Sequence, residues 1–402
     1  MGAGDLIPGN AVIGQSGGPT AVINQSLIGV VETLRGHTAI GKILGARHGV
    51  RGMVEDQFVD LSDLDPDRAE TIANSPAAAL GSTRDKPDAA YCERIFESLR
   101  KREVRYFFYI GGNDSSDTCR IVNELSNEAG YELRCFHVPK TIDNDLREND
   151  HTPGYPSAAR FVAMAFMGDN LDNASLKGIK INIVMGRHAG FLTAASALAR
   201  RSEDDGPHLI YLPENDFNPE QFVEEVGEVY ARLGRCLIAV SEGIHNDQGE
   251  AISAMLSGTG EKDAHGNVQL SGSGALGDFL ANTLRVELPA KGGKPPRVRA
   301  DTFGYLQRCW PDASPVDQRE ARAVGRCAAE VAMRGDFDGS IALIRKRDDP
   351  YESDTRVVKL TDVAAKTRVM PAEFLDAERG VSDAFLRYLT PLVGPLPRCE
   401  RL

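Results

Sequence analysis

The sequence predicts an α/β protein in which parallel sheets are flanked by helices. Strand-like runs of apolar, β-branched and aromatic residues alternate with helix-like segments almost from the start of the chain, and this alternation is typical of a parallel sheet covered by helices. Glycine-rich or charged motifs follow five of the strand-like runs. The 402 residues exceed what one small core normally organises, so we expect two domains.

The individual elements follow from local composition. Residues 11–15 form a short apolar run, and residues 104–110 read Val-Arg-Tyr-Phe-Phe-Tyr-Ile, so both are predicted strands. The remaining predicted strands are 133–138, 179–185 and 236–241, and the predicted helices are 20–34, 115–129, 188–201 and 219–233. Two polar stretches, the glycine-rich 258–274 and the glycine- and proline-rich 291–296, are predicted to be loops.

The polar motifs gather where the predicted strands end. They are Ser16-Gly17-Gly18, Gly111-Gly112-Asn113-Asp114, Thr141 to Asp145, Gly186-Arg187 and Glu242-Gly243. In open α/β sheets the carboxyl ends of parallel strands form the edge at which ligands bind. Five such motifs on one side of the sheets therefore predict a shared ligand-binding function.

Charge and cysteine usage exclude several classes of protein. The net charge of −12 argues against nucleic acid or an anionic membrane as a partner. The seven cysteines form no C-x-x-C spacing and the histidines no metal-ligand spacing, which argues for reduced thiols and against zinc. The first ten residues show no signal-peptide pattern, and no apolar run approaches the roughly 18 residues of a membrane span. We expect a cytoplasmic protein.

The segment Pro139-Lys140-Thr141-Ile142-Asp143-Asn144-Asp145 is the most informative part of the chain. A carboxylate in such a loop can accept a proton from an alcohol, and a neighbouring lysine can neutralise phosphate charge. An isolated Asp143 would more often close an Asx-turn. The density of polar neighbours favours a catalytic Asp143 that Asn144 and Asp145 hold in place.

Two glycine pairs suggest phosphate binding. Gly17-Gly18 before a helix is a weak signal by itself, because a tight turn explains it equally well; glycine there would also let backbone N–H groups approach an anion. Asp114 or Ser115 could simply cap the next helix, but a cap does not explain Gly111-Gly112. We expect a phosphate and magnesium site there.

A basic run extends from Arg297 to Arg308. Such a run is commonly a solvated face. Guanidinium groups also match phosphate oxygens, and Tyr305 adds a hydroxyl donor nearby, so Arg299, Tyr305 and Arg308 are candidate phosphate ligands.

In these residues the chain resembles the phosphofructokinases, and within them the pyrophosphate-dependent branch. The matches extend from Ser16 to Arg308, about three quarters of the chain, in the family's order. The most specific are Thr141-Ile142-Asp143-Asn144-Asp145, Met185-Gly186-Arg187, Tyr305-Leu306-Gln307-Arg308 and the loop Gly81-Ser82-Thr83-Arg84. The resemblance implies two Rossmann-like parallel-sheet domains with the active site in the cleft between them.

The resemblance also implies roles for individual residues. Asp143 is expected to take the proton from the C1 hydroxyl of fructose 6-phosphate, and Gly17 and Gly18 to bind pyrophosphate, Gly17 through its backbone N–H. Thr141, Arg187 and Arg84 are expected to contact or neutralise the transferred phosphoryl group. The sugar phosphate is expected to contact Thr141, Ile142, Asp143, Met185, Gly186, Arg187, Glu242, Arg299, Tyr305, Leu306, Gln307 and Arg308. Within this last set Arg299, Tyr305 and Arg308 are assigned to the 6-phosphate.

Two positions predict pyrophosphate as the phosphoryl donor. Members that use ATP generally have glycine where this chain has Asp114 and Lys140. A carboxylate at Asp114 would repel the α-phosphate of a nucleotide and occupy its space, whereas Lys140 would attract the departing phosphate; repulsion and attraction together build specificity.

Two positions depart from the family pattern. The aspartate that binds magnesium in the family is matched by Asn113, a neutral ligand; we still expect Mg²⁺, with Asn113 and Asp114 as ligands. Gly178 replaces an arginine that reaches a neighbouring subunit's sugar phosphate, and Lys180 is the candidate to take its place.

The expected protein is a homodimer or homotetramer that acts reversibly in glycolysis and gluconeogenesis. Residues 1–153 and about 306–360 would form the pyrophosphate domain, and residues 154–305 and about 361–402 the sugar-phosphate domain. Three alternatives stay open: an ATP-dependent member, a member that uses sedoheptulose 7-phosphate, and a catalytically silent sugar-phosphate-binding subunit.

Overall fold

The computed structural model describes residues 6–256, 274–288, 296–336, 338–378 and 380–400. Most of the two predicted loops, residues 258–273 and 291–295, lies outside the described residues. The chain divides into two compact units: unit 1 comprises residues 1–157 and 308–368, and unit 2 residues 158–307 and 369–402. The chain therefore passes from one unit to the other three times.

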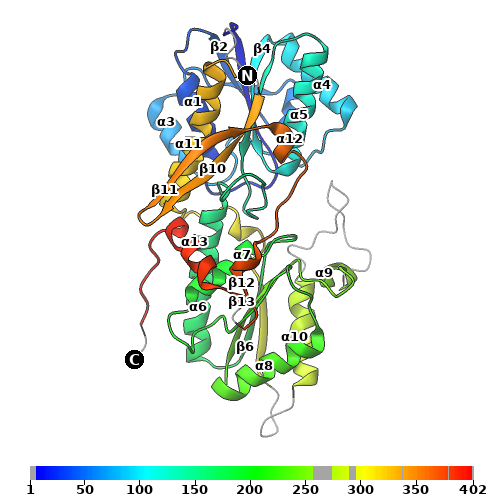
Figure 1. The fold of residues 1–402 in the computed structure, drawn as a ribbon, viewed down its shortest axis with the longest axis vertical. Coiled ribbons are helices and arrows are strands. Elements are labelled where there is room, and N and C mark those ends of the chain that lie inside the picture. Colours follow the sequence, from blue (N-terminus) through cyan, green and yellow to red (C-terminus); the bar gives the residue numbers. More distant parts are fainter. Residues whose placement is uncertain (1–5, 257–273, 289–295, 337, 379, 401–402) are drawn as a thin grey trace. The chain divides into compact units, whose positions relative to one another are not determined.

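Unit 1 contains a mixed sheet whose central strands are parallel (Figure 1). Its first segment contains β1 (Gly9–Gln15), α1 (Ile23–Leu34), β2 (Ile40–Ala46), α2 (Val50–Val54), β3 (Phe58–Asp60), α3 (Pro66–Ala73), α4 (Ala89–Lys101), β4 (Val104–Gly111), α5 (Asn113–Glu128) and β5 (Arg134–Pro139). Its second segment contains α11 (Pro315–Met333), β10 (Asp338–Asp348), β11 (Tyr351–Val358) and α12 (Leu360–Val363). The strand order is β11-β10-β5-β4-β1-β2-β3, and only the edge strands β3 and β11 pair antiparallel.

Residues that alternate along the central strands of unit 1 fill two cores. Ile13 of β1 and Phe108 of β4 pack with α1 and α11 on one face of the sheet. Val12 and Phe107 point the other way and pack with α2, α4 and α5. Burial on both faces explains why these strands are almost wholly apolar.

Unit 2 contains a second, wholly parallel sheet. Its elements are α6 (Tyr155–Ser175, which begins within unit 1), β6 (Ile179–Val184), α7 (Phe191–Ala194), η1 (Ala195–Ala199), β7 (Leu209–Tyr211), α8 (Pro219–Leu233), β8 (Cys236–Ser241), α9 (Ile252–Leu256), α10 (Ala275–Glu287), β9 (Val298–Thr302), η2 (Gly304–Gln307), η3 (Ala372–Phe374), β12 (Leu375–Asp376), β13 (Gly380–Val381) and α13 (Asp383–Val393). The strand order is β7-β8-β6-β9. Alternate residues of β6, such as Ile181 and Ile183, pack against α8 and α10.

The predicted α/β class and all five predicted strands are confirmed, with strand bounds that shift by two residues at most. The predicted helix 219–233 matches α8, and the predicted helix 20–34 begins only at Ile23. The predicted helix 188–201 is wrong: this segment forms the one-turn α7 followed by η1. Gly190 explains the late start, because its N–H donates to Glu214 Oε1 at 2.8 Å and its site leaves no room for a Cβ.

Each strand that precedes a predicted motif ends within two residues of the start of that motif. In unit 1, β1, β4 and β5 are adjacent and parallel, so the loops at 16–18, 112–114 and 140–145 leave the same edge. In unit 2, β6 and β8 are adjacent, and the loops at 186–187 and 242–243 leave together. None of the described helices is long and apolar enough to cross a bilayer.

Candidate active site

The glycine turn after β1 is fastened to the loop 81–84. Gly17 has φ +74°, a conformation that glycine adopts without strain. Its N–H donates to Thr83 O at 2.9 Å, and its carbonyl accepts from Ser82 Oγ at 2.6 Å. The predicted donation from Gly17 N–H to a phosphoryl group is not supported, because this N–H already has a partner. Gly17 instead ties the loop that carries Arg84 to the end of β1.

Lys140 reaches this turn from the end of β5. Its Nζ donates to Gly18 O at 2.8 Å, and its side chain is only 4% exposed. A Cβ at Gly17 would lie 3.1 Å from this nitrogen, so glycine makes room for it. Burial and the nearby charge of Arg308 lower the pKa of Lys140 to about 8, although Asp143 and Asp145 act in the opposite direction.

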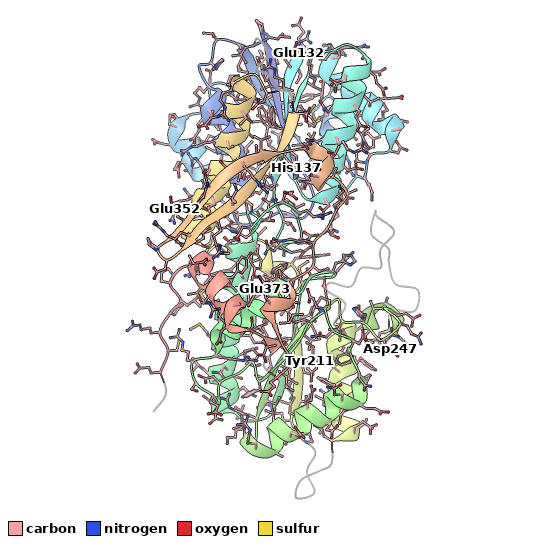
Figure 2. All side chains as sticks on the ribbon, in the orientation of Figure 1. Glu132, His137, Tyr211, Asp247, Glu352 and Glu373 are labelled. Atoms are coloured by element: carbon pink, nitrogen blue, oxygen red, sulfur yellow. The ribbon has the colours of Figure 1, made fainter. Side chains whose placement is uncertain are left out.

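His137, labelled in Figure 2, fixes the strand ends from which these loops depart. Its Nε2–H donates to Gly111 O at 2.9 Å, and its Nδ1 accepts from Ser340 Oγ at 2.8 Å. Burial lowers the pKa of His137 to about 4, so the ring is neutral. The neutral imidazole thereby links β5 to β4 on one side and to β10 on the other.

The loop after Lys140 places two carboxylates close together. Asp143 N–H donates to Thr141 Oγ1 at 3.1 Å, and Asn144 adopts φ +59° while its Oδ1 accepts from Thr152 N at 3.0 Å. Burial, and then the charge of Asp143, raise the pKa of Asp145 to about 7. The hydrogen bond from Thr152 N fits the prediction that Asn144 holds this loop, whereas the part of that prediction on Asp145 stays a prediction.

Asn113 is hydrogen-bonded to Asp145. Its Nδ2 donates to Asp145 Oδ2 at 3.0 Å, while its buried Oδ1 has no hydrogen-bond partner among the described residues. The described residues contain no group of three His, Cys, Asp or Glu side chains that could bind a metal by itself. An oxygen without a partner beside two carboxylates is nevertheless a suitable partial shell for Mg²⁺, which commonly takes one or two protein carboxylates and completes its shell with phosphate and water.

The carboxylate of Asp114, a predicted magnesium ligand, forms an ion pair with Lys86. Its Oδ1 lies 3.2 Å from Lys86 Nζ, and its side chain is 48% exposed. The predicted pair of metal ligands, Asn113 and Asp114, stays a prediction. The predicted repulsion between Asp114 and a nucleotide also stays a prediction.

In unit 2 the loops after β6 and β8 pack backbone to backbone. A Cβ at Gly243 would lie 2.2 Å from Arg187 O, and one at Gly186 would lie 2.8 Å from Ala189 O. Arg187 Nε lies 3.9 Å from Glu242 Oε1, and Glu242 is buried. The predicted sugar-binding residues Arg187 and Glu242 therefore form one cluster.

The segment after β9 reaches the same cluster. Gln307 Oε1 accepts from Met185 N at 3.2 Å. Tyr305 and Leu306 are exposed, at 50% and 62% of their surface. Arg299 is exposed on β9, opposite Lys180 of β6. Of the predicted 6-phosphate ligands, Arg299 and Tyr305 lie in unit 2, whereas Arg308 belongs to unit 1.

Gly178, which stands where the family pattern has an arginine, also has a structural reason to be glycine. Gly178 adopts φ +153°, and a Cβ there would lie 2.8 Å from Arg297 O. Lys180, the candidate replacement, pairs with Asp301 and lies 3.8 Å from Asp169. Its role toward a neighbouring subunit stays a prediction.

Sequence reasoning missed three contacts of the site, although it had singled out most of the residues that make them. Thr83 and Ser82 fasten the glycine turn, Lys86 pairs with Asp114, and Asp145 supports Asn113. Only Lys86 carried a usable signal, a cation two residues after the Gly81-Ser82-Thr83-Arg84 motif. The other two contacts join segments that are distant in sequence.

Comparison with known proteins identifies the family. A family model described as phosphofructokinase matches residues 10–332. The chain belongs to the phosphofructokinase family. This phosphofructokinase is 54% identical over 400 residues to a pyrophosphate–fructose 6-phosphate 1-phosphotransferase of Rhodospirillum rubrum, covering 99% of this chain and 97% of the relative.

Two further comparisons agree. A protein of the same name from Halomonas elongata is 38% identical over 396 residues, covering 96% of this chain and 91% of the relative. The crystal structure of a pyrophosphate-dependent phosphofructokinase from Marinobacter aquaeolei superposes with a TM-score of 0.84 at 33% identity, covering 98% of this phosphofructokinase and 94% of that chain. The predicted family and the phosphofructokinase-type fold are confirmed.

Proposed function

We propose that this phosphofructokinase transfers a phosphoryl group from pyrophosphate to the C1 hydroxyl of fructose 6-phosphate. The reaction is reversible, yields fructose 1,6-bisphosphate and phosphate, and serves glycolysis and gluconeogenesis. The observation that carries the proposal is a buried lysine, Lys140, hydrogen-bonded at the glycine turn and three residues from Asp143. The relatives that share the name of this activity support it.

Asp143 acts as the general base in this proposal. Its neighbour Asp145 has a raised pKa of about 7 because of burial and the charge of Asp143. Two close carboxylates hold one proton more readily than two negative charges. With that proton on Asp145, Asp143 accepts the proton of the C1 hydroxyl. The hydroxyl oxygen then bonds to one phosphorus of pyrophosphate, and the bond to the bridging oxygen breaks.

Cationic side chains neutralise phosphate charge in this proposal. Lys140 and Arg84 receive the pyrophosphate and the phosphate that leaves, and Thr141 contacts the phosphoryl group. Arg187, held beside the buried Glu242, stabilises the charge of the transferred group. Met185, Gly186 and Glu242 bind the sugar, and Arg299, Tyr305 and Arg308 bind its 6-phosphate.

Mg²⁺ is the cofactor we propose. Asn113 Oδ1, which has no hydrogen-bond partner among the described residues, and the carboxylate of Asp114 would hold it together with pyrophosphate oxygens. When bound, the ion offsets the negative charge of pyrophosphate. The hydrogen bond from Asn113 Nδ2 to Asp145 would leave the amide oxygen available to the ion.

Assembly and location complete the proposal. The family resemblance supports a homodimer or homotetramer, and the seven cysteines, all of them described and none in a disulfide, are compatible with the cytoplasm. Sedimentation equilibrium that gives a multiple of the 43.5 kDa chain mass would support the assembly; a single-chain mass would refute it.

A donor and acceptor assay tests the function. Purified protein with Mg²⁺ is given fructose 6-phosphate or sedoheptulose 7-phosphate, each with pyrophosphate or with ATP. We expect fructose 1,6-bisphosphate with pyrophosphate and a much lower rate with ATP. The Asp143→Ala variant is the negative control: it should lose turnover and keep sugar-phosphate binding. Turnover with ATP alone would overturn the donor, and equal turnover of wild type and variant would overturn the base.

A further inference from the structure

Arg368 lies 224 residues after Asn144 in the chain but contacts the backbone of the loop that follows β5. Its Nε–H donates to Asn144 O at 2.8 Å, and its two Nη groups donate to Asn149 O and, at 2.7 Å, to Asp150 O. Its backbone N–H donates to Asp145 O at 2.9 Å. One residue therefore pairs with four carbonyl oxygens of the irregular segment between β5 and α6, all of it within unit 1.

The conformation of this segment depends on such contacts. Asn144 is buried and adopts φ +59°, a left-handed conformation that a residue other than glycine keeps only where its surroundings fix it. Its side chain accepts from Thr152 N at 3.0 Å, and Arg368 holds its carbonyl. Asn149 is also buried, and its Oδ1 accepts from Leu343 N at 3.0 Å. Because buried carbonyl groups need partners, the loss of Arg368 would release this backbone.

Arg368 also acts on the carboxylates of the loop. Burial, and then the charge of Asp143, raise the pKa of Asp145 to about 7, and the charge of Arg368 acts in the opposite direction. The guanidinium group therefore influences the site by its charge and by its hydrogen bonds. A lysine at this position would keep the charge, but its compact ammonium group would not reproduce the planar set of donors.

We propose that Arg368 is a positioning residue for phosphoryl transfer, because its guanidinium group fixes the backbone that directly follows Asp143 and so places the Asp143 carboxylate. This inference rests on the proposed function, in which Asp143 accepts the proton of the substrate hydroxyl. Arg368 acts through the loop and touches no substrate. A general base must lie within hydrogen-bond reach of the proton it removes, and a displacement of about 1 Å can lower a rate about a hundredfold.

Arg356 supplies the matched comparison. Its Nη2 donates to Glu148 Oε2 at 2.9 Å, so it contacts the same segment as Arg368, but both side chains of this ion pair are exposed. An exposed ion pair contributes little to stability. The loss of Arg356 should therefore leave the backbone of the segment in place.

The experiment compares Arg368→Met with Arg356→Met. Initial rates give kcat and the KM values for pyrophosphate and fructose 6-phosphate, and hydrogen-exchange mass spectrometry follows the peptide 140–152 and a reference peptide from β4. We expect Arg368→Met to lower kcat about tenfold to a hundredfold with little change in either KM. Exchange should become faster in the peptide 140–152 and stay unchanged in β4. Arg356→Met should resemble wild type in both measurements.

An unchanged kcat in Arg368→Met, or a rise in KM with kcat preserved, would overturn the inference. Equal acceleration of exchange in β4 would assign Arg368 a general structural role and would overturn it as well. Arg368→Lys decides the question if the methionine variant does not fold: it should lower kcat by a smaller factor, and a wild-type kcat would contradict the role of the planar guanidinium group. Wild-type protein without pyrophosphate turnover would instead refute the proposed function, and hydrogen exchange, which needs no turnover, would still test whether Arg368 fixes the loop.

Discussion

At the scale of single residues, the two side chains that we propose select the phosphoryl donor differ greatly in burial. Lys140 is buried and hydrogen-bonded at the glycine turn, whereas Asp114 is half exposed and paired with Lys86. We therefore expect Lys140 to contribute a fixed charge to the donor site. We expect Asp114 to repel a nucleotide from the solvent side.

The double variant Asp114→Gly with Lys140→Gly tests this division. Loss of a desolvated charge partner typically costs about 2–5 kcal/mol, so we expect kcat/KM for pyrophosphate to fall by at least about thirtyfold and turnover with ATP to emerge. Initial rates with both donors measure the outcome, and the two single variants are the controls. Unchanged pyrophosphate turnover would contradict the assigned roles.

A pH profile tests the charge of Lys140. Its pKa is lowered to about 8, so in the free enzyme the ammonium group loses its proton as the pH rises through about 8. We expect kcat/KM for pyrophosphate, which reports on the free enzyme, to decline above that pH. In Lys140→Arg, whose guanidinium stays charged, the decline should disappear. A variant with the same alkaline limb as wild type would assign the limb to another group.

At the scale of elements, buried polar contacts connect the segment that follows the 140–145 loop to α11 and β11. His151 is completely buried between Asp150 Oδ2 at 2.8 Å and Glu320 Oε2 at 2.6 Å. Glu320 also accepts from Tyr351 and Ser353. These contacts join the segment just after Asp145 to elements nearly two hundred residues away in sequence.

Replacement of His151 by Ala should destabilise unit 1. Two buried carboxylates would lose the cation between them, at a cost of roughly 3–5 kcal/mol. The pKa of His151 is raised to about 9 by Glu320 and Asp150, against the effect of burial. The stabilisation by His151 is therefore complete below its unfolded pKa of about 6.5 and is lost as pH rises through about 9. Urea unfolding from pH 6 to 9.5 should show this loss in wild type and not in the variant.

The contact between α1 and α11 depends on two glycines, and the two helices lie side by side in Figure 1. A Cβ at Gly29 would lie 2.3 Å from Arg322 O, and one at Gly325 would lie 2.2 Å from Ser26 O. Each helix therefore presses its backbone against a glycine of the other. No side chain fits at either position.

Gly325→Ala should lower the melting temperature, because the helices must separate at a typical cost of about 1–3 kcal/mol. Gly168→Ala is the matched control: this glycine of α6 is exposed and a Cβ there meets no atom within 4 Å. Alanine at that position should stabilise the protein by about 0.5–1 kcal/mol. Equal effects of the two substitutions in differential scanning calorimetry would contradict the packing argument.

At the scale of the whole molecule, neither unit is a continuous piece of chain. β10, which comes from the second segment of unit 1, pairs in parallel with β5, and α11 covers one face of the sheet. Residues 1–157 alone would expose both the edge of β5 and this apolar face. Ser157 and Ser314 nevertheless contact each other, since Ser314 N donates to Ser157 Oγ at 3.1 Å.

A fused chain tests whether unit 1 folds independently. We expect residues 1–157 joined by a short glycine-serine linker to residues 308–368 to be soluble and to unfold cooperatively. Residues 1–157 alone should aggregate or bind a hydrophobic dye, because an unpaired strand edge and an uncovered core favour association. Cooperative unfolding of the shorter piece would show that the second segment is dispensable.

The sequence by itself determined the fold class, the five strands and the edge at which the chemistry lies. These depend on local composition, and the carboxyl end of a strand is a local property of the chain. The tertiary structure decided which side chains meet: Gly17 N–H with Thr83, Asn113 with Asp145, Asp114 with Lys86, and Arg308 with Gly18. The physical reason is that these contacts join segments 28 or more residues apart in the printed sequence, and their pairing depends on strand order and on where the chain changes units.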